Sequence, residues 1–338
     1  MSLTGGPTDD PTGAPASGPA ALGTRTSATA FAPASVGNVA IGFDILGFSI
    51  DAIGDRATVW RADRSDAADG GGVHISAIRG VVADLPMQAA RNTAGRALMS
   101  MQQALGLACG LTLQLDKGIP LSSGLGGSAA SAVAAVVAAN ALLAEPRPLL
   151  ELLKYAVQGE EVASGSVHVD NIAPSLYGGL VLTVGIDHPR VKQIPVPDSI
   201  RAVVVHPHMF LSTREARAIL RRSVEMADFV WQTANLAGFI SGCYTSDLDM
   251  LRESFQDVVI EPQRAALIPG FGGVRRAALA AGALGCSISG AGPTVFAWCL
   301  ASEAQAVRAA MVHEFAQHGL DSDHWVSRIV PTGARVID

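Results

Sequence analysis

The sequence predicts an α+β fold built from two domains. Segments with the alternating apolar pattern of strands and segments with the longer apolar repeat of helices follow one another along the chain. Their order lacks the regular alternation of a barrel or of a doubly wound parallel sheet, and this favours the α+β class. The length of 338 residues is sufficient for two domains of ordinary size. The Pro-rich run at 194–198 is the best candidate for the linker between them.

Residues 1–26 consist mainly of Pro, Gly, Ser, Thr and Ala, with almost no bulky side chains. Such a segment cannot bury enough surface to stay ordered, so we expect a disordered tail. The first domain should then extend over 27–194 and the second over 195–338.

In the first domain, the clearest strand is 111–115, where Leu alternates with polar residues. The clearest helix is 92–105, because its apolar side chains recur at helical spacing. A second helix should follow at 128–144, which is almost entirely Ala, Val and Leu, and a polar turn is expected at 63–72. In order, we expect strands at 28–31, 45–51, 57–61, 73–78, 111–115 and 178–186 and helices at 92–105, 128–144 and 148–163.

In the second domain, the same two patterns predict a helix-rich centre between strands. A second Gly-rich turn, 290–293, lies between two short apolar segments and is typical of a tight connection between strands. Its glycines would also allow another loop to approach closely. We expect strands at 201–206, 287–289, 295–300 and 325–330 and helices from 213, over 229–255, over 274–283 and over 303–317.

Composition excludes several classes of function. The formal net charge of −6 argues against binding to nucleic acid or to an anionic membrane surface. The four cysteines lie far apart without a C-x-x-C pair, which is typical of reduced thiols in a cytosolic protein. The longest apolar stretch, 129–144, is too short and too rich in Ala to span a bilayer. We therefore expect a soluble cytoplasmic protein.

The most informative stretch is Pro120–Ala130, which reads PLSSGLGGSAA between the predicted strand and helix. Glycines allow a backbone to approach a ligand closely, and the free N–H groups of a helix start attract anions such as phosphate. The pattern is neither a P-loop, since no lysine follows the glycines, nor a G-x-G-x-x-G dinucleotide loop. From the residues alone, a phosphate cradle and a simple strand-to-helix turn are equally compatible with it.

The densest group of ionisable residues is Glu160, Glu161, His168 and Asp170, followed by Asn171. One carboxylate could hold Mg²⁺, which prefers one or two carboxylates together with phosphate oxygens and water. A second could orient or deprotonate a hydroxyl. Taken alone, the group is better explained by a solvated helix end followed by an Asx turn.

Several further polar residues have both an ordinary and a functional interpretation. Asp44 lies between Phe43 and Ile45, so it either caps a turn or binds a polar ligand. Arg217 and Arg264 carry the planar fork that binds carboxylates through two hydrogen bonds, although each alone is better explained by a surface salt bridge. The remaining histidines lack metal-ligand spacing.

Three motifs, in the same order along the chain, resemble those of the small-metabolite kinase family that includes galactokinase, mevalonate kinase and homoserine kinase. They are 32–47, the loop at 120–130 and the glycine motif at 289–294. Within that family the resemblance is to the homoserine kinases, through SGSVHVDN at 164–171, STREAR at 212–217 and EPQR at 261–264. One departure is Gly127, which stands where the family usually has the first of two serines.

The resemblance implies transfer of a phosphoryl group from ATP, with Mg²⁺, to the side-chain hydroxyl of L-homoserine. The product would be O-phospho-L-homoserine, on the route to threonine. The implied fold has an N-terminal ATP-binding domain like ribosomal protein S5 domain 2 and a C-terminal ferredoxin-like domain. The active site would lie between these domains, and the protein would form a homodimer.

By position, the resemblance assigns the ATP phosphates to the loop and Mg²⁺ to Ser128 and Glu160. The loop residues are Pro120, Leu121, Ser122, Ser123, Gly124, Leu125, Gly126, Gly127, Ser128, Ala129 and Ala130. The substrate-binding set is Asn38, Asp44, His168, Thr213, Arg217, Arg264 and Gly290. The catalytic set is Asp170, Asn171, Ser128 and Glu160.

For Asp170 we expect orientation of the hydroxyl rather than proton abstraction, because no lysine is evidently placed to assist it. The hydroxyl could attack directly, with the γ-phosphate accepting its proton. Two other functions are compatible with the same motifs. One is a kinase of the same fold that acts on another small metabolite, and the other is a non-catalytic ligand sensor.

Overall fold

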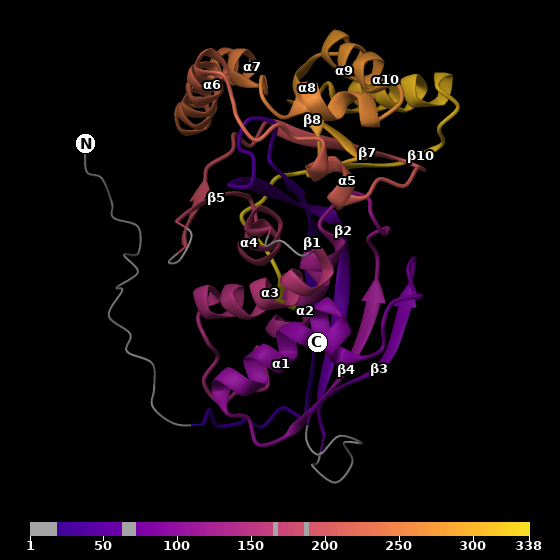
Figure 1. Cartoon of the computed structure of the whole chain (residues 1–338). Helices are drawn as coiled ribbons and strands as arrows, with labels where there is room; N and C mark the ends of the chain where they lie inside the picture. Colours follow the sequence, from indigo (N-terminus) through magenta and orange to yellow (C-terminus); the bar gives the residue numbers. More distant parts are fainter. Residues whose placement is uncertain (1–18, 63–71, 165–167, 186–188) are drawn as a thin grey trace, which may run out of the picture.

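The computed structural model describes residues 19–62, 72–164, 168–185 and 189–338 (Figure 1). Most of the expected tail, almost all of the polar turn at 63–72 and residues 165–167 of the His168 motif lie outside the described residues, as does the side chain of Glu161. Strands and helices are mixed in both halves of the chain, which confirms the α+β class. No described helix is both long and apolar enough to cross a bilayer.

The first sheet is mainly antiparallel and has the strand order β11-β1-β2-β4-β3, with β5 pairing to β2 and β6 to β5. Among the strands that the structure describes in this sheet, only β3 and β4 run parallel. The helices α1 to α4 lie on one face of this sheet (Figure 1). The strands are β1 (Ser27–Gly37), β2 (Leu46–Ala62), β3 (Val73–Gly80), β4 (Gly110–Lys117), β5 (Leu180–Val184), β6 (Arg190–Ile194) and β11 (Arg335–Val336). The helices are α1 (Thr93–Leu105), α2 (Gly127–Asn140), α3 (Leu149–Ser164) and α4 (Val169–Tyr177), with a short 3₁₀ turn at Ala89–Arg91.

The second sheet is antiparallel and has the order β10-β7-β9-β8. Helices α9 and α10 pack on one of its faces, and α6 and α7 lie to the side (Figure 1). The strands are β7 (Ile200–Pro207), β8 (Ala283–Ile288), β9 (Val295–Leu300) and β10 (Ser322–Ser327). The helices are α5 (Thr213–Ala218), α6 (Met226–Thr245), α7 (Leu248–Ser254), α8 (Glu261–Arg264), α9 (Phe271–Ala280) and α10 (Ala304–Gln317), with a 3₁₀ turn at Ala265–Leu267.

Side chains on β9 alternate between two hydrophobic cores, because successive residues of a strand face opposite sides of a sheet. Val295 and Ala297 pack in the core beneath α9 and α10. Phe296 and Trp298 point the other way and join the core of the first domain. Their rings make edge contacts with Phe48 of β2, at centroid distances of 5.4 and 5.5 Å. The core of the first domain therefore extends across the domain boundary onto one face of the second sheet, while the opposite face has a core of its own.

Several elements differ from the sequence-based expectation. The strand β2 is a single element of 17 residues that covers the two strands expected at 45–51 and 57–61. The helix α4 was not expected, because it contains Pro174 and has the Asx pair Asp170–Asn171 in its first turn. The strand β11 was also missed, since it has only two residues. The helix expected over 274–283 begins and ends earlier, at Phe271–Ala280, and the last residue of the expected range, Ala283, begins the buried strand β8.

Both ends of the described chain lie against the first domain. The Ala20 amide donates to the Leu105 carbonyl at the end of α1, so part of the segment expected as a tail is hydrogen-bonded. The last strand, β11, pairs with β1 in the first sheet although it follows the second sheet in the chain. The domain boundary near residue 194 remains a prediction. The C-terminal strand β11 follows this boundary in the chain but belongs to the sheet of the first domain.

A buried ion pair lies beneath the Gly-rich loop. Lys117 at the end of β4 pairs with Asp55 of β2, and their side chains are 5% and 0% exposed. The Lys117 ammonium also donates to the Gly127 carbonyl and to Ser131 Oγ, both at 2.8 Å. Asp55 in turn accepts the amide hydrogens of Gly118 and Ile119. This network joins β2, the end of β4 and the start of α2.

The network predicts that Lys117→Met destabilises the protein strongly. Removing one partner of a buried pair leaves an uncompensated charge and costs about 3–5 kcal/mol, whereas an exposed pair contributes about 1 kcal/mol or less. We expect this difference between Lys117→Met and Arg252→Met, whose exposed partner is Asp249. Urea unfolding of both variants measures it. Equal losses in unfolding free energy would contradict the structural role of Lys117.

Candidate functional site

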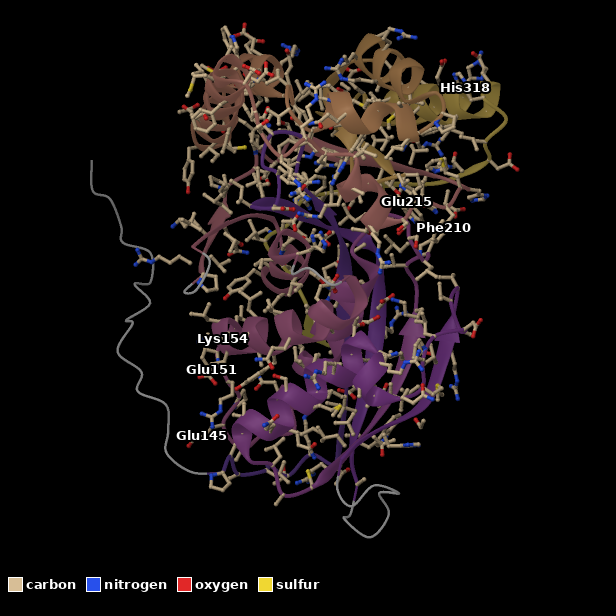
Figure 2. The ribbon with its side chains drawn as sticks, viewed as in Figure 1. Glu145, Glu151, Lys154, Phe210, Glu215 and His318 are labelled. Carbon is tan, nitrogen blue, oxygen red and sulfur yellow. The ribbon has the colours of Figure 1, made fainter. Side chains whose placement is uncertain are left out.

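A cavity of about 740 Å³ lies between the two domains. Its walls come from the loop between β1 and β2, the Gly-rich loop, α3, the start of α4, α5 and the turn at Gly290. Two residues of the second domain line the cavity: Phe210, which precedes α5, and Glu215, which belongs to α5. Both are labelled in Figure 2. The cavity therefore brings together chain segments from both domains.

Nearly all of the site residues expected from the sequence line this cavity. Three residues of the Gly-rich loop do not, because Leu125, Ala129 and Ala130 are fully buried in the hydrophobic core. They anchor the loop to the core of the first domain. The expected residues that line the cavity are Asn38, Asp44, Pro120, Leu121, Ser122, Ser123, Gly124, Gly126, Gly127, Ser128, Glu160, His168, Asp170, Asn171, Thr213, Arg217, Arg264 and Gly290.

Close packing explains the glycines of the loop. Gly124 and Gly126 have positive φ angles of 77° and 65°, which favour glycine. A Cβ atom on Gly124 would lie 2.6 Å from the Ser289 carbonyl oxygen, and one on Gly126 would lie 2.1 Å from Ser35 Oγ. Because Gly126 is the N-cap of α2, the first amides of that helix meet the cavity at Gly127 and Ser128. This geometry suits a bound anion.

Gly127, the departure from the family pattern, lies next to Lys117. A Cβ atom built on Gly127 would lie 3.6 Å from Lys117 Nζ and 3.2 Å from Ile119 Cγ2. Lys117 itself lines the cavity, so a positive charge lies close to the place where the absent serine would be. Sequence reasoning missed Lys117. The available signal was its place directly before the Gly-rich loop, in a chain with only three lysines.

Ser128 and Glu160 are joined by a hydrogen bond of 2.8 Å from Ser128 Oγ to the Glu160 carboxylate. Glu160 is 4% exposed, and this burial raises its pKa to about 7, although the Ser128 hydrogen bond and the charge of Lys117 oppose the rise. A cation would favour the ionised form of this carboxylate. Hydroxyl and carboxylate oxygens are hard ligands of the kind that Mg²⁺ prefers. The pair therefore fits a magnesium ion.

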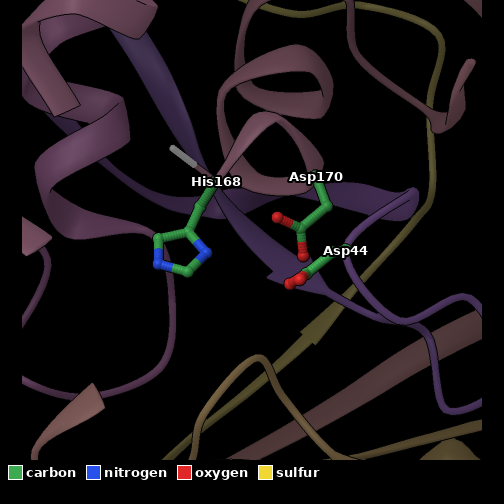
Figure 3. Close-up of side chains that lie close together, drawn as sticks. All are labelled: Asp44, His168 and Asp170. Atoms are coloured by element: carbon green, nitrogen blue, oxygen red, sulfur yellow. The ribbon is translucent and has the colours of Figure 1, made fainter. Parts of the chain in front are cut away.

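Asp170 is the most deeply buried acid of the cavity. Its carboxylate lies close to the carboxylate of Asp44 and to the ring of His168 (Figure 3). One oxygen of each acid and one ring nitrogen of His168 lie within 4.8 Å of one another. Burial and the neighbouring Asp44 charge raise the pKa of Asp170 to about 7, while the Asn38 amide and Arg217 act in the opposite direction. Burial, together with Arg217, lowers the pKa of His168, so its ring favours the neutral form.

Arg217 and Asp44 form a bidentate pair across the domain boundary, with hydrogen bonds of 3.0 and 2.8 Å. Arg264 is 3% exposed, and two of its nitrogens donate to the carbonyl oxygens of Ala216 and Gly290. Asn38 Nδ2 donates to the same Gly290 oxygen at 2.8 Å. The two arginines thus differ: Arg217 is paired with an acid at the cavity, and Arg264 is held by backbone groups.

The loop that carries Asn38 and Asp44 has an unusual backbone. Asn38, Val39 and Ala40 in succession have positive φ angles, as does Asp44. This conformation costs free energy for residues with a side chain, and most of all for β-branched Val39. Strain of this kind persists where surrounding contacts impose it, and it is common at binding sites.

The comparisons with known proteins agree with this geometry. Residues 92–179 match the family described as "GHMP kinases N terminal domain", and residues 239–317 match "GHMP kinases C terminal". The homoserine kinase of Xanthomonas campestris pv. campestris (strain B100) is 51% identical, with 94% of this chain and 96% of that protein covered. The homoserine kinase of Xylella fastidiosa (strain M12) is 50% identical, with coverage of 93% and 95%.

Solved structures show the same fold. The crystal structure of homoserine kinase from Cytophaga hutchinsonii superimposes with a TM-score of 0.88 at 41% identity, covering 93% of this chain and 98% of that one. The structure of L. major mevalonate kinase has a TM-score of 0.66 at 16% identity, with coverage of 92% and 99%, and shares the fold. These matches confirm the two-domain arrangement expected from the sequence.

The burial of Asp170 predicts that Asp170→Asn stabilises the fold at pH 8. A folded-state pKa of about 7, above the usual 3.8, means that the stability present below pH 3.8 is lost progressively as the pH rises through 7 and the buried carboxylate ionises. Asparagine removes that charge, so the melting temperature at pH 8 should rise by at least about 2 °C, an increase that shrinks at pH 5. Calorimetry measures both values. A lower melting temperature than wild type at pH 8 would contradict the assignment, and exposed Asp249→Asn is the control.

Proposed function

Because this chain belongs to the homoserine kinases, within the GHMP kinase family, we propose that it phosphorylates L-homoserine on its side-chain hydroxyl with ATP. The observation that supports this most strongly is the arrangement of charge in the cavity. A helix start and Gly-rich loop suited to phosphates line one part of it. A paired acid and arginine suited to an amino acid line another.

The nucleotide phosphates lie against the Gly-rich loop and the first amides of α2. Lys117 Nζ, which already holds the Gly127 carbonyl, adds positive charge beside this loop. The cavity continues from the loop to Leu85, Pro86 and Asn92, and we assign this end to the nucleoside. Ser128 and Glu160 would hold Mg²⁺, which when bound would neutralise charge on the nucleotide phosphates.

The amino-acid end is defined by Asp44 and Arg217. In the structure these two groups neutralise each other. Homoserine carries an ammonium and a carboxylate on one carbon. It can therefore replace the Asp44–Arg217 ion pair, with its ammonium bound to Asp44 and its carboxylate bound to Arg217. Thr213, Asn38, His168 and the Gly290 turn complete this end. Arg264 contributes its remaining nitrogen, Nη2, because its Nε and Nη1 are held by carbonyls.

Asp170 receives the hydroxyl of homoserine. Its neighbour Asn171 faces the phosphate side, since Asn171 Oδ1 accepts from Ser35 Oγ, which touches the Gly-rich loop. With its pKa raised to about 7, the Asp170 carboxyl group titrates near neutral pH, and its ionised form can accept a hydrogen bond or a proton. The ammonium of Lys117 pairs with Asp55 and donates to the Gly127 carbonyl of the Gly-rich loop, so we assign to Asp170 mainly the orientation of the hydroxyl.

The wider context follows from the same assignment. The product is O-phospho-L-homoserine, an intermediate of threonine biosynthesis, and the enzyme acts in the cytoplasm as a homodimer. The described part of the chain contains no helix that could span a membrane, which is compatible with this location.

A coupled assay of ADP release tests the proposed function. The purified protein, with Mg²⁺ and ATP, is offered L-homoserine, mevalonate and shikimate in parallel. We expect turnover with L-homoserine and only background with the other two, because only homoserine presents an ammonium to Asp44 and a carboxylate to Arg217. Binding of ATP and homoserine without any ADP would instead indicate a ligand sensor.

Arg217→Ala is expected to raise the KM for homoserine by about 10- to 100-fold, because charge-assisted hydrogen bonds contribute about 1.5–3 kcal/mol. The KM for ATP should change little, since Arg217 pairs with Asp44 at the amino-acid end. Arg222→Ala, at an exposed position outside the cavity, is the matched control. Steady-state kinetics of both variants decide the matter. An unchanged homoserine KM in Arg217→Ala would make the carboxylate assignment wrong.

A further inference from the structure

Phe43 lies one residue before Asp44 and lines the cavity from the first domain. The guanidinium carbons of Arg217 and Arg264 each lie 5.3 Å from the centroid of its ring. Both distances are within the range of cation–π contacts. A single aromatic ring of the first domain therefore contacts Arg217 and Arg264, two arginines that line the cavity from the second domain.

The two arginines need such a contact because they are close enough to repel each other. Burial of Arg264, together with the charge of Arg217, lowers the pKa of Arg264 to about 10. Arg264 is held in place by the Ala216 and Gly290 carbonyls. The negative face of an aromatic ring attracts both guanidinium groups and offsets part of their repulsion.

Arg217 donates to a single partner, Asp44, whereas Arg264 donates to two backbone carbonyls. The Nη1 and Nη2 atoms of Arg217 donate to Asp44, and its Nε atom is buried without a hydrogen bond to any residue the structure describes. When a substrate ammonium occupies Asp44, this pair is divided and the two hydrogen bonds are released. The contact with Phe43 does not involve the Asp44 carboxylate, so it persists when the pair opens.

We propose that Phe43 is a positioning residue that determines specificity for a substrate carboxylate. It holds Arg217 and Arg264 in place when Asp44 binds the substrate ammonium instead of Arg217. This inference rests on the proposed function, because the carboxylate and the ammonium belong to the amino-acid substrate. It assigns to an apolar side chain the selection of amino acids over amines that lack a carboxylate.

The test compares Phe43→Leu, which keeps apolar bulk without an aromatic ring, with Phe43→Tyr, which keeps the ring. Two acceptors are used: L-homoserine and 3-amino-1-propanol, which is homoserine without its carboxylate. We expect Phe43→Leu to raise the KM for homoserine by about 3- to 30-fold, the range that cation–π contacts provide. The KM for ATP, the kcat with homoserine, and the kcat/KM for 3-amino-1-propanol should remain within about twofold of wild type. Phe43→Tyr should restore the homoserine KM.

Two results would overturn the inference while the proposed function stands. One is an unchanged homoserine KM in Phe43→Leu, and the other is an equal loss with both acceptors, which would indicate general damage to the loop. Absence of homoserine turnover by the wild-type protein would overturn the proposed function and this inference together. If the melting temperature shows that Phe43→Leu is unfolded, Phe43→Met carries the same comparison.

Discussion

The hydrogen bonds of Gly290 are the interaction on which the site depends. Its amide donates to the Gly37 carbonyl, and its own carbonyl oxygen accepts from Asn38 Nδ2 and Arg264 Nη1. Both donor side chains are buried, so the loss of this acceptor would leave polar groups unsatisfied, at about 1–3 kcal/mol each. The adjacent Ser289 hydroxyl donates to the Gly124 carbonyl of the phosphate loop. One turn of the second domain thereby sets the position of two loops of the first.

The hydrogen bonds of the Gly290 turn explain how one cavity has a phosphate-binding end and an amino-acid-binding end. The Gly-rich loop is held from below by Lys117 and Asp55, and it presents amides and Ser128 to phosphates. The loop at 38–44 is held by Gly290, and it presents Asp44 to the second domain. The start of α4 lies between these loops, because a Cβ atom on Gly37 would meet Asp170 and one on Gly126 would meet Asn171. Phosphoryl transfer needs mainly positioning and charge stabilisation, and this arrangement supplies both.

Patterns that are local in the chain were predictable, and contacts between distant segments were not. The Gly-rich loop could be identified because its strand, glycines and helix are consecutive. The pair of Asp55 and Lys117 could not, because 62 residues separate them and neither lies in a recognisable pattern. The helix α4 was missed because Asp170, Asn171 and Pro174 favour turns, and packing against β1 and β2 overrides that preference. The role of Phe43 could not be predicted, because the two arginines that lie against its ring come from distant positions in the chain.

The most direct test of the account is a crystal structure with L-homoserine, Mg²⁺ and a non-hydrolysable ATP analogue. The account predicts the analogue's phosphates on the amides at Gly127 and Ser128, with the metal ion bound to Ser128 and Glu160. It predicts the homoserine carboxylate on Arg217, the ammonium on Asp44, and the hydroxyl directed from Asp170 toward the γ-phosphate. Homoserine bound in the reverse orientation, or with the Asp44–Arg217 pair still closed, would contradict the account.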